Sequence, residues 1–239
     1  MLYTQTVEAG TLVLIKELMS NQELESFNLV GGTNLSLKLG HRMSVDIDLF
    51  TDRDFDAQQI SRHLAQTYNA ENIKTLKNGI FCFINGIKVD IIAHQYPLLN
   101  EIEKVDGIRV LSLQDIGAMK LKAILHSGTR LKDFVDIHFL LEQLPLQNIT
   151  EGFVQKYPEV NVQMAHKALL YFDDFNKNEK INFLGEGISL KEMEGRLKAA
   201  VANPKQVFKP DQTKTLHPKN IQPSVKNTTK RNHRKRPGL

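Results

Sequence analysis

Hydrophobic and polar positions follow two different patterns along this chain. Up to residue 111, stretches with the helical period alternate with short stretches in which every second residue is apolar. Helices are expected at 7–20, 33–40 and 56–69. Strands are expected at 27–30, 45–50, 72–76, 79–84 and 86–93, and Asn85–Gly86 has the sequence of a hairpin turn. This alternation predicts an α/β fold, built on a mixed sheet with flanking helices.

After residue 111 the apolar positions recur almost wholly at helical spacing. Helices are expected at 112–126, 131–144, 161–175 and 189–202. From Lys205 onward the chain is poor in large apolar residues, so it cannot bury enough surface to offset the entropy lost on ordering. We therefore expect an α/β core at 1–111, a helical domain at 112–204 and a disordered basic tail at 205–239.

Composition narrows the class of protein. With 239 residues, of which 41% are hydrophobic and 24% charged, the chain is typical of a globular protein with a substantial core. No apolar run approaches the roughly 18 residues that span a membrane, and the N-terminus does not resemble a signal peptide. The single cysteine, Cys82, excludes a disulfide framework. We expect a cytoplasmic protein with no membrane contact.

The formal net charge of +4 hides an asymmetry between the tail and the rest of the chain. The segment from Lys205 to the end has ten Lys and Arg residues against one acid, so the remaining body is negative. A basic tail commonly makes salt-sensitive contacts with nucleic acid, independent of sequence. A solvated terminus with no partner is the alternative, and composition favours neither.

Two aspartates one residue apart are the most informative polar residues. Asp46 and Asp48 lie in the run VDIDLF, which has the alternation of a strand, so both carboxylates should share one face. Val45, Ile47 and Leu49 should face the other way, into a core. Two carboxylates on a rigid strand suit Mg²⁺, or Mn²⁺, because these hard cations prefer oxygen ligands and substrate phosphates.

A third acid, Asp90, lies in the strand-like run KVDII, on the same face as Lys88. If this strand lies beside VDIDLF, three carboxylates converge on one face of the sheet. Three acids suit two-metal phosphoryl transfer, in which the third completes the metal shell or acts as general base. Unpaired carboxylates in apolar strand sequence are costly, which favours a functional role.

A glycine turn precedes the acidic strand. Gly31 and Gly32 stand where a strand gives way to a helix, so backbone N–H groups there are able to approach a phosphate, and Thr33 offers a hydroxyl. Arg42 and Ser44, in the polar connector that follows, are further phosphate-binding candidates. The structural alternative is a tight turn with Thr33 as an N-cap.

Lys120 is unusual because it falls within the apolar stripe of its helix. An inward lysine needs an anion, either a triphosphate or a structural carboxylate. The next helix has the complementary anomaly, with Asp133 among apolar side chains and Asp136 at the edge of the stripe. A structural Lys120–Asp133 ion pair is therefore the alternative to phosphate binding. Arg130, in the loop before that helix, is a candidate contact for nucleotide or acceptor.

Four segments together resemble the AbiEii/AbiGii nucleotidyltransferase-like toxin family, part of the polymerase-β-type nucleotidyltransferase superfamily. They are GGTNLSLKLGHRMSVDIDLF at 31–50, KVDII at 88–92, MKLKAI at 119–124 and GTRLKDFVDIHFLL at 128–141. The resemblance implies a nucleotidyltransferase-type sheet, with the helical half completing the active-site cleft. It implies metal or catalytic roles for Asp46, Asp48, Asp90, Lys120, Asp133 and Asp136, and phosphate binding at Thr33.

The same resemblance implies a reaction and a setting. A nucleotide would pass from an NTP to an acceptor, and a tRNA 3′ end is the suspected acceptor for some relatives. Such proteins act beside a separate antitoxin, as a toxin–antitoxin or phage-defence pair. Two other functions stay open: a D-x-D glycosyltransferase that uses a nucleotide-sugar, and a non-catalytic RNA-binding or antitoxin-partner module that retains the fold.

Overall fold

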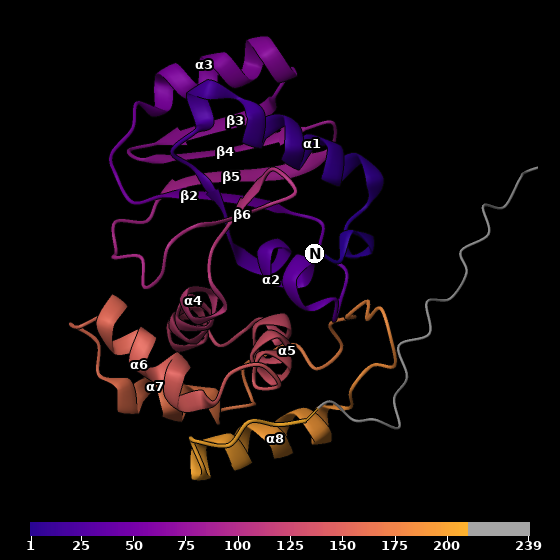
Figure 1. Cartoon of the computed structure of the whole chain (residues 1–239), viewed down its shortest axis with the longest axis vertical. Coiled ribbons are helices and arrows are strands. Elements are labelled where there is room, and N and C mark those ends of the chain that lie inside the picture. Colours follow the sequence, from indigo (N-terminus) through magenta and orange to yellow (C-terminus); the bar gives the residue numbers. More distant parts are fainter. Residues whose placement is uncertain (210–239) are drawn as a thin grey trace, which may run out of the picture.

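A mixed sheet of seven strands organises the chain, of which the computed structural model describes residues 1–209 (Figure 1). The strand order is β3-β4-β5-β2-β1-β7-β6. The strands are β1 Asn28–Leu29, β2 Ile47–Thr51, β3 Glu71–Leu76, β4 Gly79–Ile84, β5 Ile87–Ala93, β6 Glu103–Val105 and β7 Ile108–Val110. The predicted α/β fold is confirmed. The predicted tail lies, from residue 210, outside the described residues.

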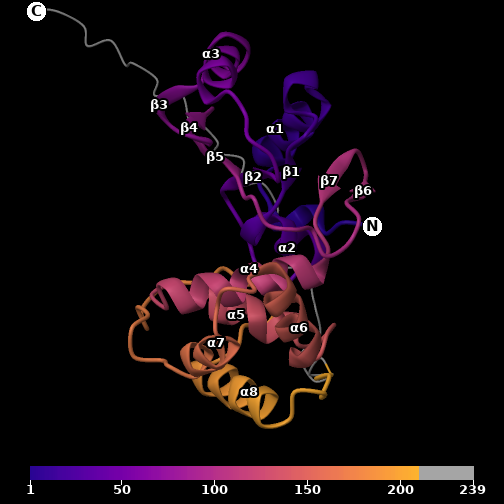
Figure 2. The ribbon, with the colours of Figure 1, turned by 90° about the vertical axis from the view of Figure 1, so that its left-hand side faces the viewer.

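Helices cover one face of the sheet. Figure 2 shows α1 (Ala9–Ser20) and α3 (Ala57–Tyr68) together on one side of the strands. The alternate strand residues that face these helices form a buried cluster, which includes Ile80, Val89 and Ile91. Helix α2, Gly31–Leu39, lies on the other side of the sheet and ends at Gly40, whose φ of +71° gives the left-handed C-cap that glycine favours.

The C-terminal half is helical, as predicted, and lies below the sheet in both ribbon views (Figures 1 and 2). Its helices are α4 Leu113–His126, α5 Leu131–Leu140, α6 Leu146–Lys156, α7 Val162–Leu169 and α8 Leu190–Ala202. Their apolar faces form a second buried cluster. Two clusters accompany the two halves of the chain, while the exact domain boundaries stay a prediction.

Several predicted elements differ from the structure. Helix α6 was not expected, although Ile149 and Phe153 on one of its faces are fully buried, and neither was the β6–β7 hairpin. The helix expected at 161–175 ends at Leu169, because Phe172 and Phe175 reach the core from an irregular segment. None of the described helices is long and apolar enough to cross a membrane.

The expected facing of Val45 was wrong. Strand β2 begins at Ile47, whose side chain is fully buried together with that of Leu49, whereas the side chain of Val45 is among the exposed hydrophobic residues at 59%. The alternation therefore does not extend backward through Asp46. Because Asp46 precedes the paired part of the strand, its direction is set by the connector before it rather than by the sheet.

Helix packing in the C-terminal half gives a test of the fold. A Cβ atom added at Gly117 in α4 would lie 2.7 Å from Leu140 Cδ2 and 3.1 Å from Ile149 Cγ2. Gly117→Ala should therefore lower the free energy of unfolding by about 1–3 kcal/mol, because α4 must move away from α5 and α6. Gly195 in α8 has no atom within 4 Å of the same position. Gly195→Ala should instead stabilise the protein by about 0.5–1 kcal/mol. Denaturant unfolding measures both, and equal effects would contradict the packing.

Candidate active site

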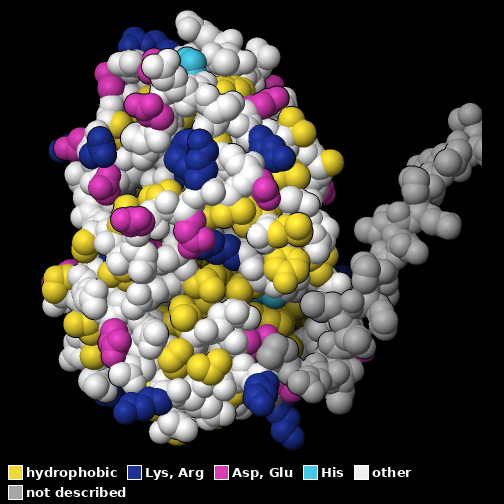
Figure 3. Space-filling model, viewed as in Figure 1, with side chains coloured by type: hydrophobic (Ala, Val, Ile, Leu, Met, Phe, Trp, Pro, Cys, Tyr) yellow, Lys and Arg dark blue, Asp and Glu magenta, His cyan; other side chains and the backbone are white. Residues whose placement is uncertain are grey.

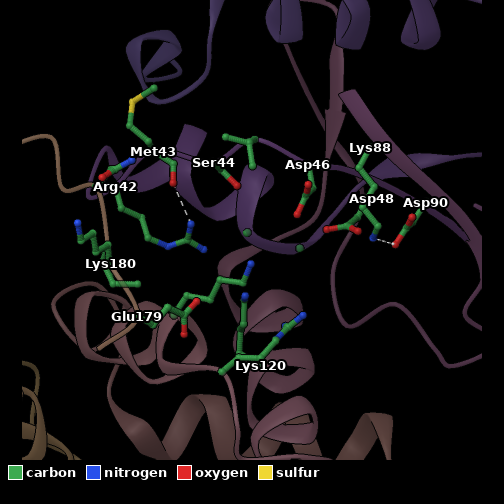
Figure 4. A pocket seen from close by; sticks show the side chains of 17 residues that line it. Arg42, Met43, Ser44, Asp46, Asp48, Lys88, Asp90, Lys120, Glu179 and Lys180 are labelled. Atoms are coloured by element: carbon green, nitrogen blue, oxygen red, sulfur yellow. Dashed lines mark hydrogen bonds and ion pairs between the residues drawn. The ribbon is translucent and has the colours of Figure 1, made fainter. Parts of the chain in front are cut away.

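A polar pocket of about 270 Å³ opens between the sheet and the helical half (Figure 4). Basic side chains outnumber acidic ones in its lining. The lining residues are Gly31, Gly32, Arg42, Met43, Ser44, Val45, Asp46, Asp48, Lys88, Asp90, Lys120, Arg130, Lys132, Glu179, Lys180, Ile181 and Asn182. Most of the residues predicted from the sequence therefore meet here. Thr33, Asp133 and Asp136 lie behind the lining.

The carboxylates come from two parallel strands in register. Asp48 in β2 pairs with Asp90 in β5, which meets the condition on which the sequence argument for convergent carboxylates rested, so their side chains leave the same face of the sheet. Burial raises the pKa of Asp48, and the nearby charges of Asp90 and Asp46 raise it further. Three acids thus face one pocket and repel one another. A bound cation would relieve that repulsion.

The two glycines make room for side chains rather than merely for a turn. A Cβ atom at Gly31 would lie 2.2 Å from Asp48 Oδ2, and the φ of Gly31 is +68°, which side-chain-bearing residues rarely adopt. A Cβ atom at Gly32 would lie 2.6 Å from Arg42 Nη2. Glycine at these positions therefore brings a carboxylate and a guanidinium against the first turn of α2.

Asp90 combines one paired and one free oxygen. Lys88 Nζ lies 2.5 Å from Asp90 Oδ2, while Asp90 Oδ1 is buried and has no hydrogen-bond partner in the described residues. Although burial opposes its charge, the bond to Asp90 raises the pKa of Lys88. Figure 4 shows this pair beside Asp48. The Lys88 ammonium occupies the position of a counter-ion to the acid cluster.

The donor set suits a hard divalent cation, but its side chains do not yet converge. All three acids offer carboxylate oxygens, and Asp90 Oδ1 is an acceptor without a donor. Among residues 1–209, no group of three acid, histidine or cysteine side chains is already placed to hold an ion. Binding would therefore draw Asp46, Asp48 and Asp90 together and weaken the hold of Lys88 on Asp90.

Thr33 and Ser44 form an internal support for the connector. The Thr33 hydroxyl lies within hydrogen-bond distance of the Asp46 carbonyl oxygen and 2.9 Å from Ser44 Oγ. It points behind the pocket, and since α2 begins at Gly31, Thr33 is not the N-cap of the helix. These bonds hold the segment that leads into the acidic strand. Ser44, unlike Thr33, reaches the pocket lining.

One fully buried carboxylate contacts three basic side chains behind the pocket, of which Arg42 and Lys120 are cations, while burial lowers the pKa of His41. Asp136 in α5 accepts two bonds from Arg42, at 2.7 and 2.9 Å, and lies 2.9 Å from His41 Nε2 and 2.6 Å from Lys120 Nζ. Burial opposes the ionised carboxylate, yet Lys120 and Arg42 hold the pKa of Asp136 well below its usual value. Because both its oxygens are occupied and its side chain has no exposure, Asp136 anchors the cations that line the pocket.

Asp133, one turn earlier in α5, completes this network. Lys120 Nζ lies 2.8 Å from Asp133 Oδ1, so the ion pair considered as the structural alternative is present. Arg130 also bonds both Asp133 oxygens, at 2.7 and 2.9 Å. An ammonium group has three donors, and Asp133 and Asp136 together take two of those of Lys120. The third remains for an anion in the pocket.

A loop that sequence reasoning did not assign closes the last side of the pocket. The Met43 N–H donates to the Asn182 carbonyl at 2.7 Å, and Arg42 forms a β-bridge with Phe183. Glu179 accepts a bond of 2.9 Å from the Leu131 N–H, at the start of α5. The 176–188 segment has no periodic pattern, so only the tertiary structure shows that Lys180 and Asn182 belong to the site.

Facing carboxylates, a glycine-led helix and a cation-lined pocket thus lie together on one mixed sheet. The family model described as nucleotidyl transferase AbiEii toxin, of a type IV toxin–antitoxin system, matches residues 13–214. The chain therefore belongs to the AbiEii nucleotidyltransferase toxin family.

The individual proteins that the chain resembles share between 15% and 34% of its sequence over the matched parts. The chain is 34% identical over 154 residues to an uncharacterized protein of Aquifex aeolicus (strain VF5), a match that covers 62% of this chain and 74% of that protein. JHP933 from Helicobacter pylori is 18% identical with a TM-score of 0.46, over 80% of this chain and 87% of that structure. The polyadenylate synthase of Megavirus is 15% identical with a TM-score of 0.41; the match covers 55% of this chain but only 31% of that protein.

Removal of the buried carboxylate should destabilise the protein strongly. Asp136→Asn leaves Arg42 and Lys120 buried with one counter-charge fewer, so the free energy of unfolding should fall by about 3–5 kcal/mol. The matched control is Glu194→Gln, which removes a more exposed charge 3.4 Å from Lys198 and should change it by less than about 0.5 kcal/mol. A loss below about 1 kcal/mol in Asp136→Asn would contradict the anchoring role.

The same variant has a pH signature. Since the pKa of Asp136 is lowered on folding, its stabilising contribution is complete above the unfolded pKa of about 3.9 and is lost as the pH falls toward the folded value. The stability of the wild-type protein should therefore fall more steeply below about pH 4 than that of Asp136→Asn. Denaturant unfolding at successive pH values measures the difference, and parallel curves would count against it.

The pKa of Asp48 shifts on folding in the opposite direction to that of Asp136. The pKa of Asp48 is raised on folding, so its ionisation costs stability once the pH exceeds the unfolded value. Asp48→Asn should raise the midpoint of thermal unfolding at pH 7, whereas Asp106→Asn, at the exposed β6–β7 turn, should not. MgCl₂ should raise the midpoint of the wild-type protein more than that of Asp48→Asn. An unfolded Asp48→Asn, or equal responses to the ion, would exclude a cation site at this carboxylate.

Proposed function

We propose that this protein is a metal-dependent nucleotidyltransferase, which transfers a nucleotide from an NTP to an acceptor hydroxyl. The observation that carries the proposal is the meeting of Asp46, Asp48 and Asp90 with a set of basic side chains in one pocket. A triphosphate needs cations around it, and a divalent ion bound by its phosphates needs carboxylates. The pocket offers both, side by side.

In this proposal the basic residues bind the triphosphate and the acidic residues bind the metal ion. Lys120 and Arg42, positioned by Asp133 and Asp136, would bind the triphosphate together with the N–H groups of the first turn of α2. Arg130 and Lys88 line the same pocket and add charge. Asp46, Asp48 and Asp90 would hold Mg²⁺ or Mn²⁺, which neutralises developing charge and activates the attacking hydroxyl.

The reaction is a displacement at the α-phosphorus. The acceptor oxygen forms a bond to that phosphorus, the bond to the bridging β-phosphate oxygen breaks, and pyrophosphate leaves. The hydroxyl proton must be taken up, and we propose that Asp90 Oδ1, which is buried and has no hydrogen-bond partner in the described residues, accepts it. Asp90 is therefore assigned as proton acceptor as well as ligand.

The biological setting follows from the family rather than from the site. Membership in a family of type IV toxin–antitoxin toxins supports a toxin that acts beside a separately encoded antitoxin, in a toxin–antitoxin or phage-defence pair. A tRNA 3′ end is the acceptor we propose, because the family resemblance suggests tRNA and its 3′ end offers the free hydroxyl that the reaction requires. Nucleotide transfer to tRNA would block its further use.

Labelled nucleotides test the reaction directly. Incubation with each α-³²P-labelled NTP, Mg²⁺ and total tRNA should label RNA with the wild-type protein and with Asp106→Asn. Asp48→Asn should lose at least about a hundredfold of the rate, since the metal site supplies several kcal/mol of transition-state stabilisation. Label on another molecule would retain the chemistry and reject tRNA. No labelling of any acceptor would favour a binding module, and hydrolysis of nucleotide-sugars alone would favour the glycosyltransferase.

A further inference from the structure

One face of β3, β4 and β5 is open beside the acid cluster. The register places Phe81 opposite Asp90 and Phe83 opposite Lys88, so both rings leave the face that carries the carboxylates. Cross-strand partners of this kind have Cβ atoms about 5 Å apart. On the next strand, Lys74 lies opposite Phe81 on the same face. Glu71 lies opposite Phe83 at the far end of β3, so the part of this face next to the pocket carries aromatic and basic side chains and its outer end one acid.

This face is exposed, in contrast to its reverse. Phe83 has 39% and Leu76 54% exposure, and Lys74 is also exposed. Figure 2 shows α1 and α3 on the other side of these strands, where Ile80 and Val89 are fully buried. Within the described residues, each helix in substantial contact with β3, β4 or β5 lies on that covered side. The aromatic face is thus left for a partner.

The chemistry of the face favours a single-stranded nucleic acid. Bases stack on aromatic side chains whatever their sequence, and lysines between the rings bind the phosphates. Lys88 belongs to both surfaces, because it lines the pocket and also lies opposite Phe83 of the neighbouring strand β4. On the molecular face drawn in Figure 3, by comparison, acidic and basic side chains are interspersed without a shared arrangement.

We propose that the open face of β3–β5 binds the single-stranded 3′ end of a polynucleotide acceptor. Bases stack on Phe83 and Phe81, Lys74 contacts the backbone, and the terminal hydroxyl reaches the pocket beside Asp90. The proposal rests on the proposed function, since it assigns the acceptor side of that reaction. It adds a binding surface and two aromatic residues outside the pocket that stack on bases of any sequence.

A substitution that keeps an apolar side chain but removes the aromatic ring separates stacking from simple apolar contact. The probe is octaadenylate with a 5′ fluorescein and a free 3′ hydroxyl, and its binding to the full-length protein is followed by fluorescence anisotropy. Phe83→Leu should weaken binding about tenfold, and Phe81→Leu with Phe83→Leu further, because base stacking on each ring is lost. Phe83→Trp should retain binding. Tyr171→Leu, an aromatic residue with 52% exposure in the helical half, is the matched control and should bind as the wild type.

The outcomes distinguish failure of the binding surface from failure of the proposed nucleotide transfer. If nucleotide transfer occurs but the KM for octaadenylate is the same in Phe83→Leu, the surface is wrong and the reaction stands. If no acceptor is labelled and the leucine variants still lose binding, the surface stands as a single-strand site and the reaction is wrong. Undetectable binding by the wild type overturns the proposal. So does a wild-type dimer in light scattering that Phe83→Leu converts to a monomer, because the face would then bind a second copy.

Discussion

The site depends on one buried carboxylate. Asp136 binds Arg42 from the connector that precedes the acidic strand and Lys120 from α4, so a single side chain joins the sheet half to the helical half. Removal of either partner would leave the buried Asp136 carboxylate with one counter-charge fewer in a medium that solvates it poorly. The two halves therefore have little freedom to change their separation at this point. The walls of the pocket are positioned by this constraint.

Two sets of carboxylates in the same region have opposite electrostatics. Although burial opposes ionisation in both sets, cations hold the pKa values of Asp133 and Asp136 down, while burial and like charges raise that of Asp48. The first set stabilises the fold; the second is an unfavourable arrangement that the fold tolerates. Unfavourable local arrangements that a rigid surrounding maintains are characteristic of functional sites. The ion pairs of Asp133 and Asp136 behind the pocket stabilise the fold and so offset the repulsion among the carboxylates that line it.

The sequence predicted those features of the site that the periodicity of a single strand or helix determines. The alternation of VDIDLF and KVDII was enough to expect Asp48 and Asp90 on one face if the two strands were neighbours, which only the structure shows. The anomaly of a lysine in an apolar stripe was enough to expect an anionic partner for Lys120. The facing of Thr33 and the exposure of Val45 were missed, because the connector that governs both is irregular. Nor did any pattern indicate the 179–182 loop, since a bridge to Arg42, remote in the sequence, determines its place.

The acids lie at the boundary between the covered and open parts of one sheet face. Phe50 in β2, on the face that carries Asp48, packs against the helical core, whereas Phe83 in β4 remains exposed. A strand pair at such a boundary presents carboxylates to an enclosed cationic pocket on one side and to an open surface on the other. A triphosphate needs the enclosed side, because its charges require several fixed cations. A large acceptor needs the open side, because only its terminus has to enter. The position of Asp48 and Asp90 in the sheet meets both requirements.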